Sequence, residues 1–258
     1  MNAHIRSTHL SAAAPRWRSY LLEARCEFLR LLREPMYVLP TLLFPALFYL
    51  LFAVLLGSGR GAAGPALLAN YCAFGVIGAG LFGFGVTTAM DREQGFLQLK
   101  RALPLPPGAW LLARMAMAVL FAIMVALLLM VLAAGVAGVV LPAATWALLL
   151  AVSALGVLPF CALGMYLGSL VSGNAAPGLI NLLFLPMAFL SGLLLPLAVL
   201  PGPLAAMAPA WPAFHLGQVA LKAVGSDAGD SLWLHLAVLV LVTLAFFLLA
   251  HRRLATVG

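Results

Sequence analysis

The residues able to do acid–base, nucleophilic or metal chemistry are few in this chain and lie far apart. His215, His235 and His251 fall in different segments, without the spacing that is typical of a metal site. Ser191 and His235 could together serve an intramembrane hydrolase, but no GxSxG turn accompanies them. The chain also lacks the GxxxxGKS/T loop that cradles nucleotide phosphates. The sequence therefore predicts no catalytic residue, no metal ligand and no cofactor in this chain, and any ATP must be bound by another polypeptide.

Ionisable residues are also scarce inside the apolar segments that must position any site. Only Arg114, near one end of its segment, and His235 are found there, and no Asp or Glu is expected within the membrane. Buried carboxylates and histidines are the usual equipment of proton-coupled transporters. Their scarcity favours an external source of energy over proton coupling.

The composition identifies an integral membrane protein. Apolar residues make up 65% of the 258 residues and charged residues only 8%, whereas soluble domains contain about 45–50% and about 25%. The net charge of +7 is spread over short flanks and forms no single patch, so a nucleic-acid partner is not expected. The three cysteines, Cys26, Cys72 and Cys161, form no paired motif and are interpreted as small apolar residues.

The predicted fold is a single all-α domain over residues 1–258 with six transmembrane helices. Each span needs about 20 mostly apolar residues, and six segments meet this: residues 36–56, 66–89, 111–140, 144–171, 178–197 and 231–250. Residues 16–34 predict an amphipathic helix in the membrane interface, with a solvated lead-in as the alternative. Residues 198–230 are apolar but interrupted by prolines, which favours short re-entrant helices over a loop on the surface.

The basic residues predict the orientation. Twelve of the fourteen Lys and Arg residues precede the first span, lie in the connection between the second and third spans, or follow the sixth. Only Arg60 and Lys222 belong to the opposite side. By the positive-inside rule, both termini and the long polar connection are expected in the cytoplasm.

Residues 91–103 predict a short amphipathic helix in this polar connection. Asp91 is expected to cap its start, Lys100 and Arg101 suit its C-terminal end, and Pro104 stops it. Such a helix could dock a partner, or it could be a plain connector.

Small residues at four-residue spacing mark two spans. Gly75, Ala79 and Gly83 lie in the second span, and Gly164, Gly168 and Ser172 lie in the fourth. Such faces let helix backbones approach closely. Packing within one chain and packing between two copies both remain open.

Two blocks resemble the permease subunit of type-2 ATP-binding-cassette (ABC) exporters. The family pattern R-E-x-G-x-L-x-x-L-x-x-x-P-L is similar to residues 92–105, which begin Arg92-Glu93-Gln94-Gly95. A second block, S-G-x-x-x-P-x-x-x-L-P, is similar to residues 191–201. Phe96 stands where a Thr is common in the family. The six spans and the N-terminal helix also match, so the resemblance covers nearly the whole chain.

The resemblance implies a homodimer in the inner (cytoplasmic) membrane that carries two separate ABC ATPase subunits, which bind ATP and Mg. It implies that residues 92–103 form the family's coupling helix, which touches the ATPase through Arg92, Glu93, Gly95, Phe96, Leu97, Leu99 and Arg101. Candidates for the substrate path on spans one, two and five are Phe44, Tyr49, Phe82, Phe84, Asn181, Phe184 and Phe189. Their apolar, aromatic character suits a hydrophobic or amphipathic cargo such as a drug, lipid or glycoconjugate. The alternatives are a membrane anchor or assembly factor, and an intramembrane enzyme.

Overall fold

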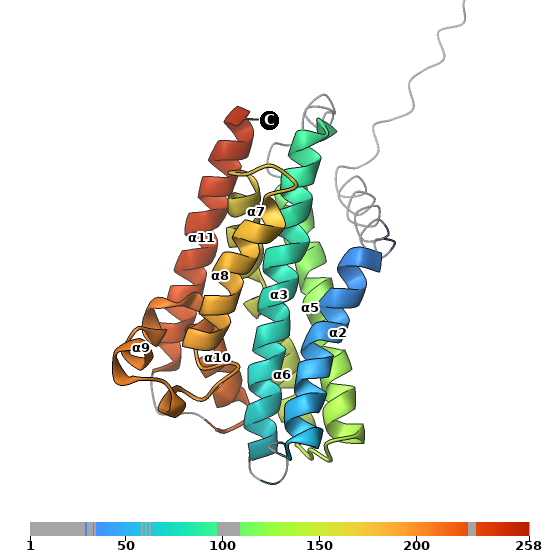
Figure 1. Cartoon of the computed structure of the whole chain (residues 1–258), viewed down its shortest axis with the longest axis vertical. Helices are drawn as coiled ribbons and strands as arrows, with labels where there is room; N and C mark the ends of the chain where they lie inside the picture. Colours follow the sequence, from blue (N-terminus) through green and yellow to red (C-terminus); the bar gives the residue numbers. More distant parts are fainter. Residues whose placement is uncertain are drawn as a thin grey trace, which may run out of the picture.

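The structure is a computed structural model that describes residues 35–57, 59, 61, 63–96, 109–226 and 231–257, together with Leu29 and Arg33. Within these residues every regular element is a helix, and five helices are long and apolar enough to cross a membrane. The chain thus has the all-α architecture of a multi-pass membrane protein (Figure 1). The interfacial helix expected at residues 16–34 lies outside the described residues, apart from Leu29 and Arg33.

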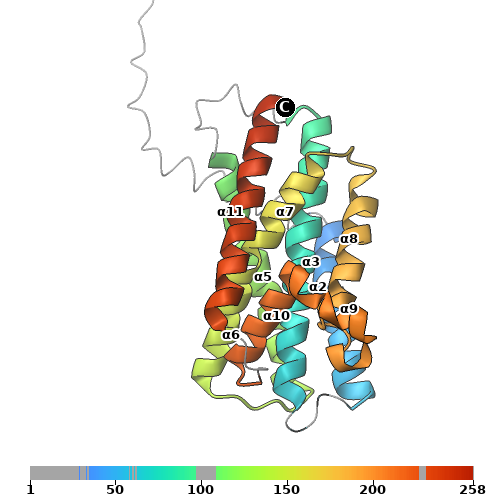
Figure 2. The same cartoon turned by 90° about the vertical axis from the view of Figure 1, so that its left-hand side faces the viewer.

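The first three long helices stand side by side in Figures 1 and 2. Helix α2 (Pro35–Leu50) continues into a π-helical stretch, η1 (Leu51–Leu55). Helix α3 (Ala63–Glu93) follows, and α5 (Ala109–Gly135) comes after the connection. Together α2 and η1 cover the first predicted span except residue 56, and α3 contains the second. The third was predicted to end at residue 140, but α5 ends at Gly135.

The fourth predicted span is interrupted once. It consists of α6 (Ala143–Gly156) and α7 (Leu158–Gly168), separated by Val157, with Pro159 in the first turn of α7. Proline has no N–H to donate to the preceding turn, but the backbone of Val157 stays helical and the two pieces form one apolar stretch.

The fifth segment is shorter than the predicted span. Helix α8 (Ala176–Leu190) has 15 residues, fewer than the roughly 20 that cross a bilayer without help. It ends at Ser191, and Gly192 then adopts a positive φ of 81°, a backbone conformation that favours glycine. The boundary expected at residue 197 is therefore wrong, and a sixth complete span stays a prediction.

Short helices follow before the last long one. They are η2 (Leu197–Val199), α9 (Gly202–Ala206), η3 (Ala208–Ala210) and α10 (Pro212–Ala223), after which α11 (Leu232–Val257) ends the bundle. Helix α10 packs against α3, α6 and α11, and residues 213–220 are buried. This part of the proline-rich region therefore belongs to the bundle, while its depth in a membrane stays a prediction.

Helix α3 is the centre of the bundle and packs against α2, α5, α6, α7, α8 and α10. Its backbone touches that of α7, because a Cβ added at Gly168 would lie 2.1 Å from the carbonyl oxygen of Gly85. A Cβ at Gly75 would lie 2.6 Å from Val125 of α5. Packing within one chain thus accounts for Gly75 and Gly168, one glycine from each predicted small-residue face.

Candidate functional site

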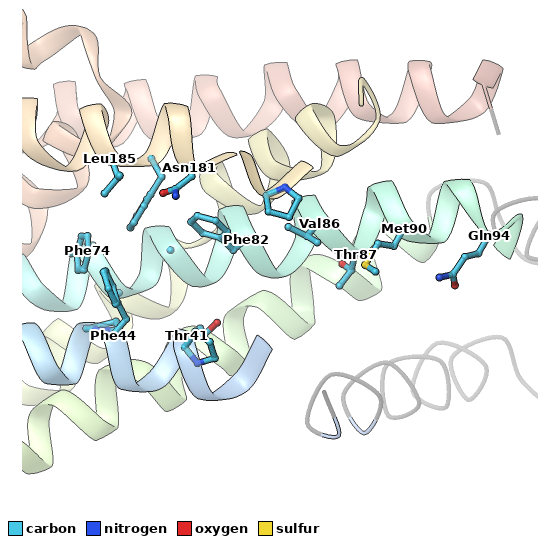
Figure 3. A pocket seen from close by; sticks show the side chains of 16 residues that line it. Thr41, Phe44, Phe74, Phe82, Val86, Thr87, Met90, Gln94, Asn181 and Leu185 are labelled. Carbon is cyan, nitrogen blue, oxygen red and sulfur yellow. The ribbon is translucent and has the colours of Figure 1, made fainter. Parts of the chain in front are cut away.

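A pocket of about 640 Å³ lies between α2, α3 and α8. Figure 3 shows it running along α3, with Phe74 towards one end and Gln94 towards the other. Its lining residues are Pro40, Thr41, Phe44 and Pro45 of α2; Phe74, Gly75, Gly78, Phe82, Val86, Thr87 and Met90 of α3; Gln94 just beyond α3; and Pro177, Asn181, Phe184 and Leu185 of α8. The size is that of a site for a drug-sized molecule.

The wall near Phe74 is aromatic. The rings of Phe74 and Phe184 stack with centroids 5.2 Å apart, and Phe82 meets Phe184 edge-on at 5.4 Å. The ring centroid of Phe44, on α2, lies 6.2 Å from that of Phe74. Because the rings fix one another, this wall offers large, preorganised apolar surfaces.

The polar groups of the lining are uncharged. They are Thr41, Thr87, Gln94 and Asn181, and none of the lining residues that the structure describes carries a formal charge. Figure 3 places Thr87 and Gln94 away from the ring of Phe74. The pocket therefore changes along its length from an aromatic region to one with hydroxyl and amide groups.

Four of the seven predicted path residues meet in this pocket: Phe44, Phe82, Asn181 and Phe184. Tyr49 is instead buried against Tyr71, with ring centroids 5.9 Å apart. Phe84 is buried and Phe189 is 41% exposed, and neither belongs to the lining.

Sequence reasoning missed Phe74, Thr41 and Thr87. A signal for Phe74 existed, since residues 74, 78, 82, 86, 90 and 94 all line the pocket and follow one another at a spacing of four. On a helix, residues four apart lie on the same face. Phe82 at the centre of this row could therefore have identified the others.

A buried ion pair lies next to the pocket. The guanidinium of Arg114 donates from Nη2 to the carboxylate of Asp91, and the two side chains are 2% and 1% exposed. Arg114 Nη1 donates to the hydroxyls of Thr87, at 2.9 Å, and Thr88, at 2.8 Å. Its guanidinium carbon also lies 4.3 Å from the ring centroid of Trp110, within reach of a cation–π contact.

This pair corrects one expectation. Asp91 was expected to cap a separate helix in an exposed connection, but α3 continues to Glu93 and Asp91 is buried in its last turn. A carboxylate is therefore present inside the bundle. Its charge is tolerated there because the guanidinium pairs with it directly.

A second polar cluster, which we call the junction, joins the ends of α3, α7 and α11. Arg92 donates to the carbonyl oxygens of Ser169 and Val171, both at 2.7 Å, and Arg253 Nε reaches Ser169 O at 3.2 Å. Carbonyl groups at a helix end have no partner within the helix, so the guanidinium groups supply one. The Glu93 carboxylate accepts from the Gly173 N–H at 2.8 Å.

The seven residues predicted to contact the ATPase thus divide into three groups. Arg92 and Glu93 are engaged inside the chain, at the junction. Gly95 has a φ of 75° in the turn that ends α3, and Phe96 is 40% exposed. The other three, Leu97, Leu99 and Arg101, lie outside the described residues.

The structure also brings together two histidines that the sequence separates by 20 residues. Nδ1 of His215 lies 2.8 Å from Nδ1 of His235, and Nε2 of His215 lies 2.9 Å from the Pro209 carbonyl oxygen. A carbonyl only accepts, so His215 Nε2 carries a proton, and in the neutral pair His235 Nδ1 donates to His215 Nδ1. The Ser191 hydroxyl donates to Met187 O in its own helix, which gives no support to a Ser191–His235 hydrolase.

A helical membrane bundle that encloses a pocket of this size is an architecture that suits a membrane transport subunit. Residues 20–224 match the family described as "ABC-2 type transporter". The chain belongs to this family and is a membrane subunit of an ABC transporter. Family membership implies partnership with an ABC ATPase.

A curated relative agrees with this assignment. The chain is 26% identical over 227 residues to a Bacillus subtilis (strain 168) protein named "Putative transport permease YvfS", which covers 87% of the chain and 92% of the relative. The family resemblance drawn from residues 92–105 and 191–201 is confirmed.

Proposed function

We propose that the chain is the membrane-spanning subunit of an ATP-driven ABC exporter. Two copies form the translocation path, and two separate ATPase subunits bind ATP and Mg and supply the energy. The complex lies in the inner membrane with six spans per copy, α8 included, and both termini in the cytoplasm. The cargo is a hydrophobic or amphipathic molecule without a net charge.

The pocket carries this proposal. Its rings supply apolar surface for an aromatic or aliphatic body, and Thr41, Thr87, Gln94 and Asn181 supply uncharged polar partners. A charged ligand would lose its hydration there without gaining a counter-charge. The nearby cations Arg92 and Arg114 are engaged with backbone carbonyls and with Asp91.

The arrangement of charges supports the orientation. In Figure 1 the end of α3 and the end of α11 lie at the same end of the bundle. Arg92 and Arg253 both bind Ser169 O at this end. Arg114 pairs with Asp91, which directly precedes Arg92 on α3. Such a basic end is typical of the cytoplasmic side.

We propose that residues 92–103 form the ATPase-binding segment. The end of α3 and the start of α5 flank this segment, and its motif is the one that resembles the family's coupling helix. Because Arg92 and Glu93 are engaged at the junction, we assign direct ATPase contact to Phe96, Leu97, Leu99 and Arg101, and anchoring to Arg92 and Glu93.

The test is dye export by energised cells that produce the chain with its ATPase. The probe is N-phenyl-1-naphthylamine, a neutral aromatic amphipath that fluoresces in apolar surroundings. Production of the complex should lower dye accumulation, and Gly78→Leu should abolish this effect. The added side chain enters the pocket, where even a Cβ at Gly78 would lie 3.5 Å from Phe184.

Gly135→Leu is the matched control, because nothing lies within 4 Å of a Cβ at Gly135. The anionic analogue 1-anilinonaphthalene-8-sulfonate should be exported poorly. Equal export by Gly78→Leu and the unsubstituted chain, or export without the ATPase, would contradict the proposal.

A further inference from the structure

Thr87 belongs to the pocket and to the buried ion-pair network at once. Its side chain lines the pocket, and its hydroxyl donates to Gly83 O at 2.6 Å while accepting from Arg114 Nη1 at 2.9 Å. A hydroxyl oxygen can accept two hydrogen bonds. Apart from the bond from Arg114, it can therefore accept one from a ligand in the pocket.

Thr88 makes the same bonds without facing the pocket. Its hydroxyl donates to Phe84 O and accepts from the same Arg114 nitrogen at 2.8 Å. It is fully buried and is not among the lining residues. Both threonines thus bind Arg114, but of the two Thr87 lines the pocket. Comparing their variants distinguishes the effect of contact with the pocket from the effect of contact with Arg114.

The two residues of the ion pair flank the proposed ATPase-binding segment, residues 92–103. Asp91 lies two residues before the end of α3, and Arg114 lies on the second turn of α5. Their pairing therefore holds Asp91, at the end of α3, against the start of α5. A displaced guanidinium must carry Asp91 with it, because a separated charge would be left buried and unpaired.

The junction extends this linkage beyond α3. Arg92 follows Asp91 directly and binds the end of α7 through Ser169 and Val171. Arg253 of α11 binds the same Ser169 carbonyl. A shift of Arg114 is thus passed to α3, and from α3 to α7 and α11.

We propose that Thr87, Arg114 and Asp91 form a relay that transmits occupancy of the pocket to the ATPase-binding segment. Thr87 acts as the sensor, and Arg114 and Asp91 act as positioning residues. A ligand that donates to the Thr87 hydroxyl weakens its bond to Arg114 and shifts the ion pair. This proposal rests on the proposed function, since it assumes that the pocket binds cargo and that residues 92–103 meet the ATPase.

Linkage gives a direct test. If occupancy and nucleotide state are coupled, the ATP analogue AMP-PNP must change the affinity for the dye by the same factor by which the dye changes affinity for AMP-PNP. The complex in lipid nanodiscs is titrated with N-phenyl-1-naphthylamine, whose secondary amine is an N–H donor, with and without AMP-PNP. For the unsubstituted chain we expect a change in the dissociation constant of about five-fold or more.

Thr87→Val removes the hydroxyl at nearly constant volume and should bring the ratio of the dye's dissociation constants with and without AMP-PNP close to one. Because the dye loses one hydrogen bond but keeps the aromatic wall, its dissociation constant should rise by about two- to ten-fold and binding should stay saturable. Thr87→Ser keeps the hydroxyl and should restore the ratio. Thr88→Val should retain it, which a general loosening of Arg114 would not allow.

The outcomes are distinguishable. A full ratio in Thr87→Val, or equal loss in Thr88→Val, overturns the relay. Dye binding that is unaffected by AMP-PNP in the unsubstituted chain overturns it too, while leaving the pocket in place. Absence of saturable dye binding to the unsubstituted chain overturns the proposed function, and the relay with it.

Discussion

Arg92 of α3 donates from Nη1 to the carbonyl oxygen of Ser169, directly after the end of α7, at 2.7 Å. A residue of the motif that identifies the family thus joins two helices of the same chain. The consequences of this contact can be tested by substitution.

Arg92→Ala should destabilise the chain by about 1.5–3 kcal/mol, the range for hydrogen bonds to charged groups. The carbonyl oxygen of Val171 loses the bond from Arg92, and that of Ser169 keeps the longer bond, of 3.2 Å, from Arg253 Nε. Arg92→Lys should recover part of the loss, since an ammonium cannot reproduce the fork of a guanidinium. The measurement is thermal unfolding in detergent. Arg33→Ala, at an exposed position outside the junction, is the control, and equal melting temperatures for Arg92→Ala and this control would refute the anchoring role.

The Asp91–Arg114 pair should behave as a unit. Asp91→Leu or Arg114→Met leaves a buried charge without its partner and should cost about 3–5 kcal/mol. The double variant Asp91→Leu/Arg114→Met leaves no charge and should be much closer in stability to the unsubstituted chain. Denaturant unfolding of the single variants and the double variant measures this. Strictly additive losses would show that the two side chains act independently.

Gly168→Ala should weaken the contact between α3 and α7. The new Cβ would lie 2.1 Å from the backbone oxygen of Gly85, and backbone cannot move aside cheaply, so we expect a loss of about 1–3 kcal/mol. Gly178→Ala in α8 meets nothing within 4 Å and should be nearly neutral. Unfolding midpoints compare the two, and a neutral Gly168→Ala would mean that the helices are not in close contact.

The sequence was sufficient for features that depend on local patterns. The positions of most helices followed from apolar runs of about 20 residues, and Phe82 and Phe184 were recognised as aromatic residues on spans. It was insufficient where distant residues decide. Asp91 suggested an exposed helix start because its neutralising partner is 23 residues away, and the His215–His235 contact joins separate helices. The end of α8 was missed because apolar residues 193–195 continue the pattern beyond Gly192, where the backbone turns.

Cysteine labelling in intact cells should test the orientation. Gln94→Cys should react only after the membrane is permeabilised, and Ser226→Cys should react from outside. These positions avoid the adjacent Gly95 and Gly225, whose φ values of 75° and 73° would strain a cysteine. Both substitutions are made in a chain that also carries Cys26→Ser. Cys72 and Cys161 are kept, because they are buried and should not react with the label. Labelling of both positions from the same side would contradict the proposed topology.

Phe184→Ala should reduce the affinity of the pocket for aromatic ligands. Phe184 stacks on Phe74 and meets Phe82 edge-on, so its removal takes away one wall and releases two rings. Aromatic pairs contribute about 0.5–1.5 kcal/mol beyond their buried area, and we expect the dissociation constant of N-phenyl-1-naphthylamine to rise about ten-fold. Phe189→Ala on the same helix is the control, because Phe189 is 41% exposed and does not line the pocket. The measurement is a fluorescence titration in nanodiscs, corrected with empty nanodiscs. If both variants weakened binding equally, the dye would be reporting on the lipid-facing surface of α8, and the cargo site would have to be sought outside the pocket.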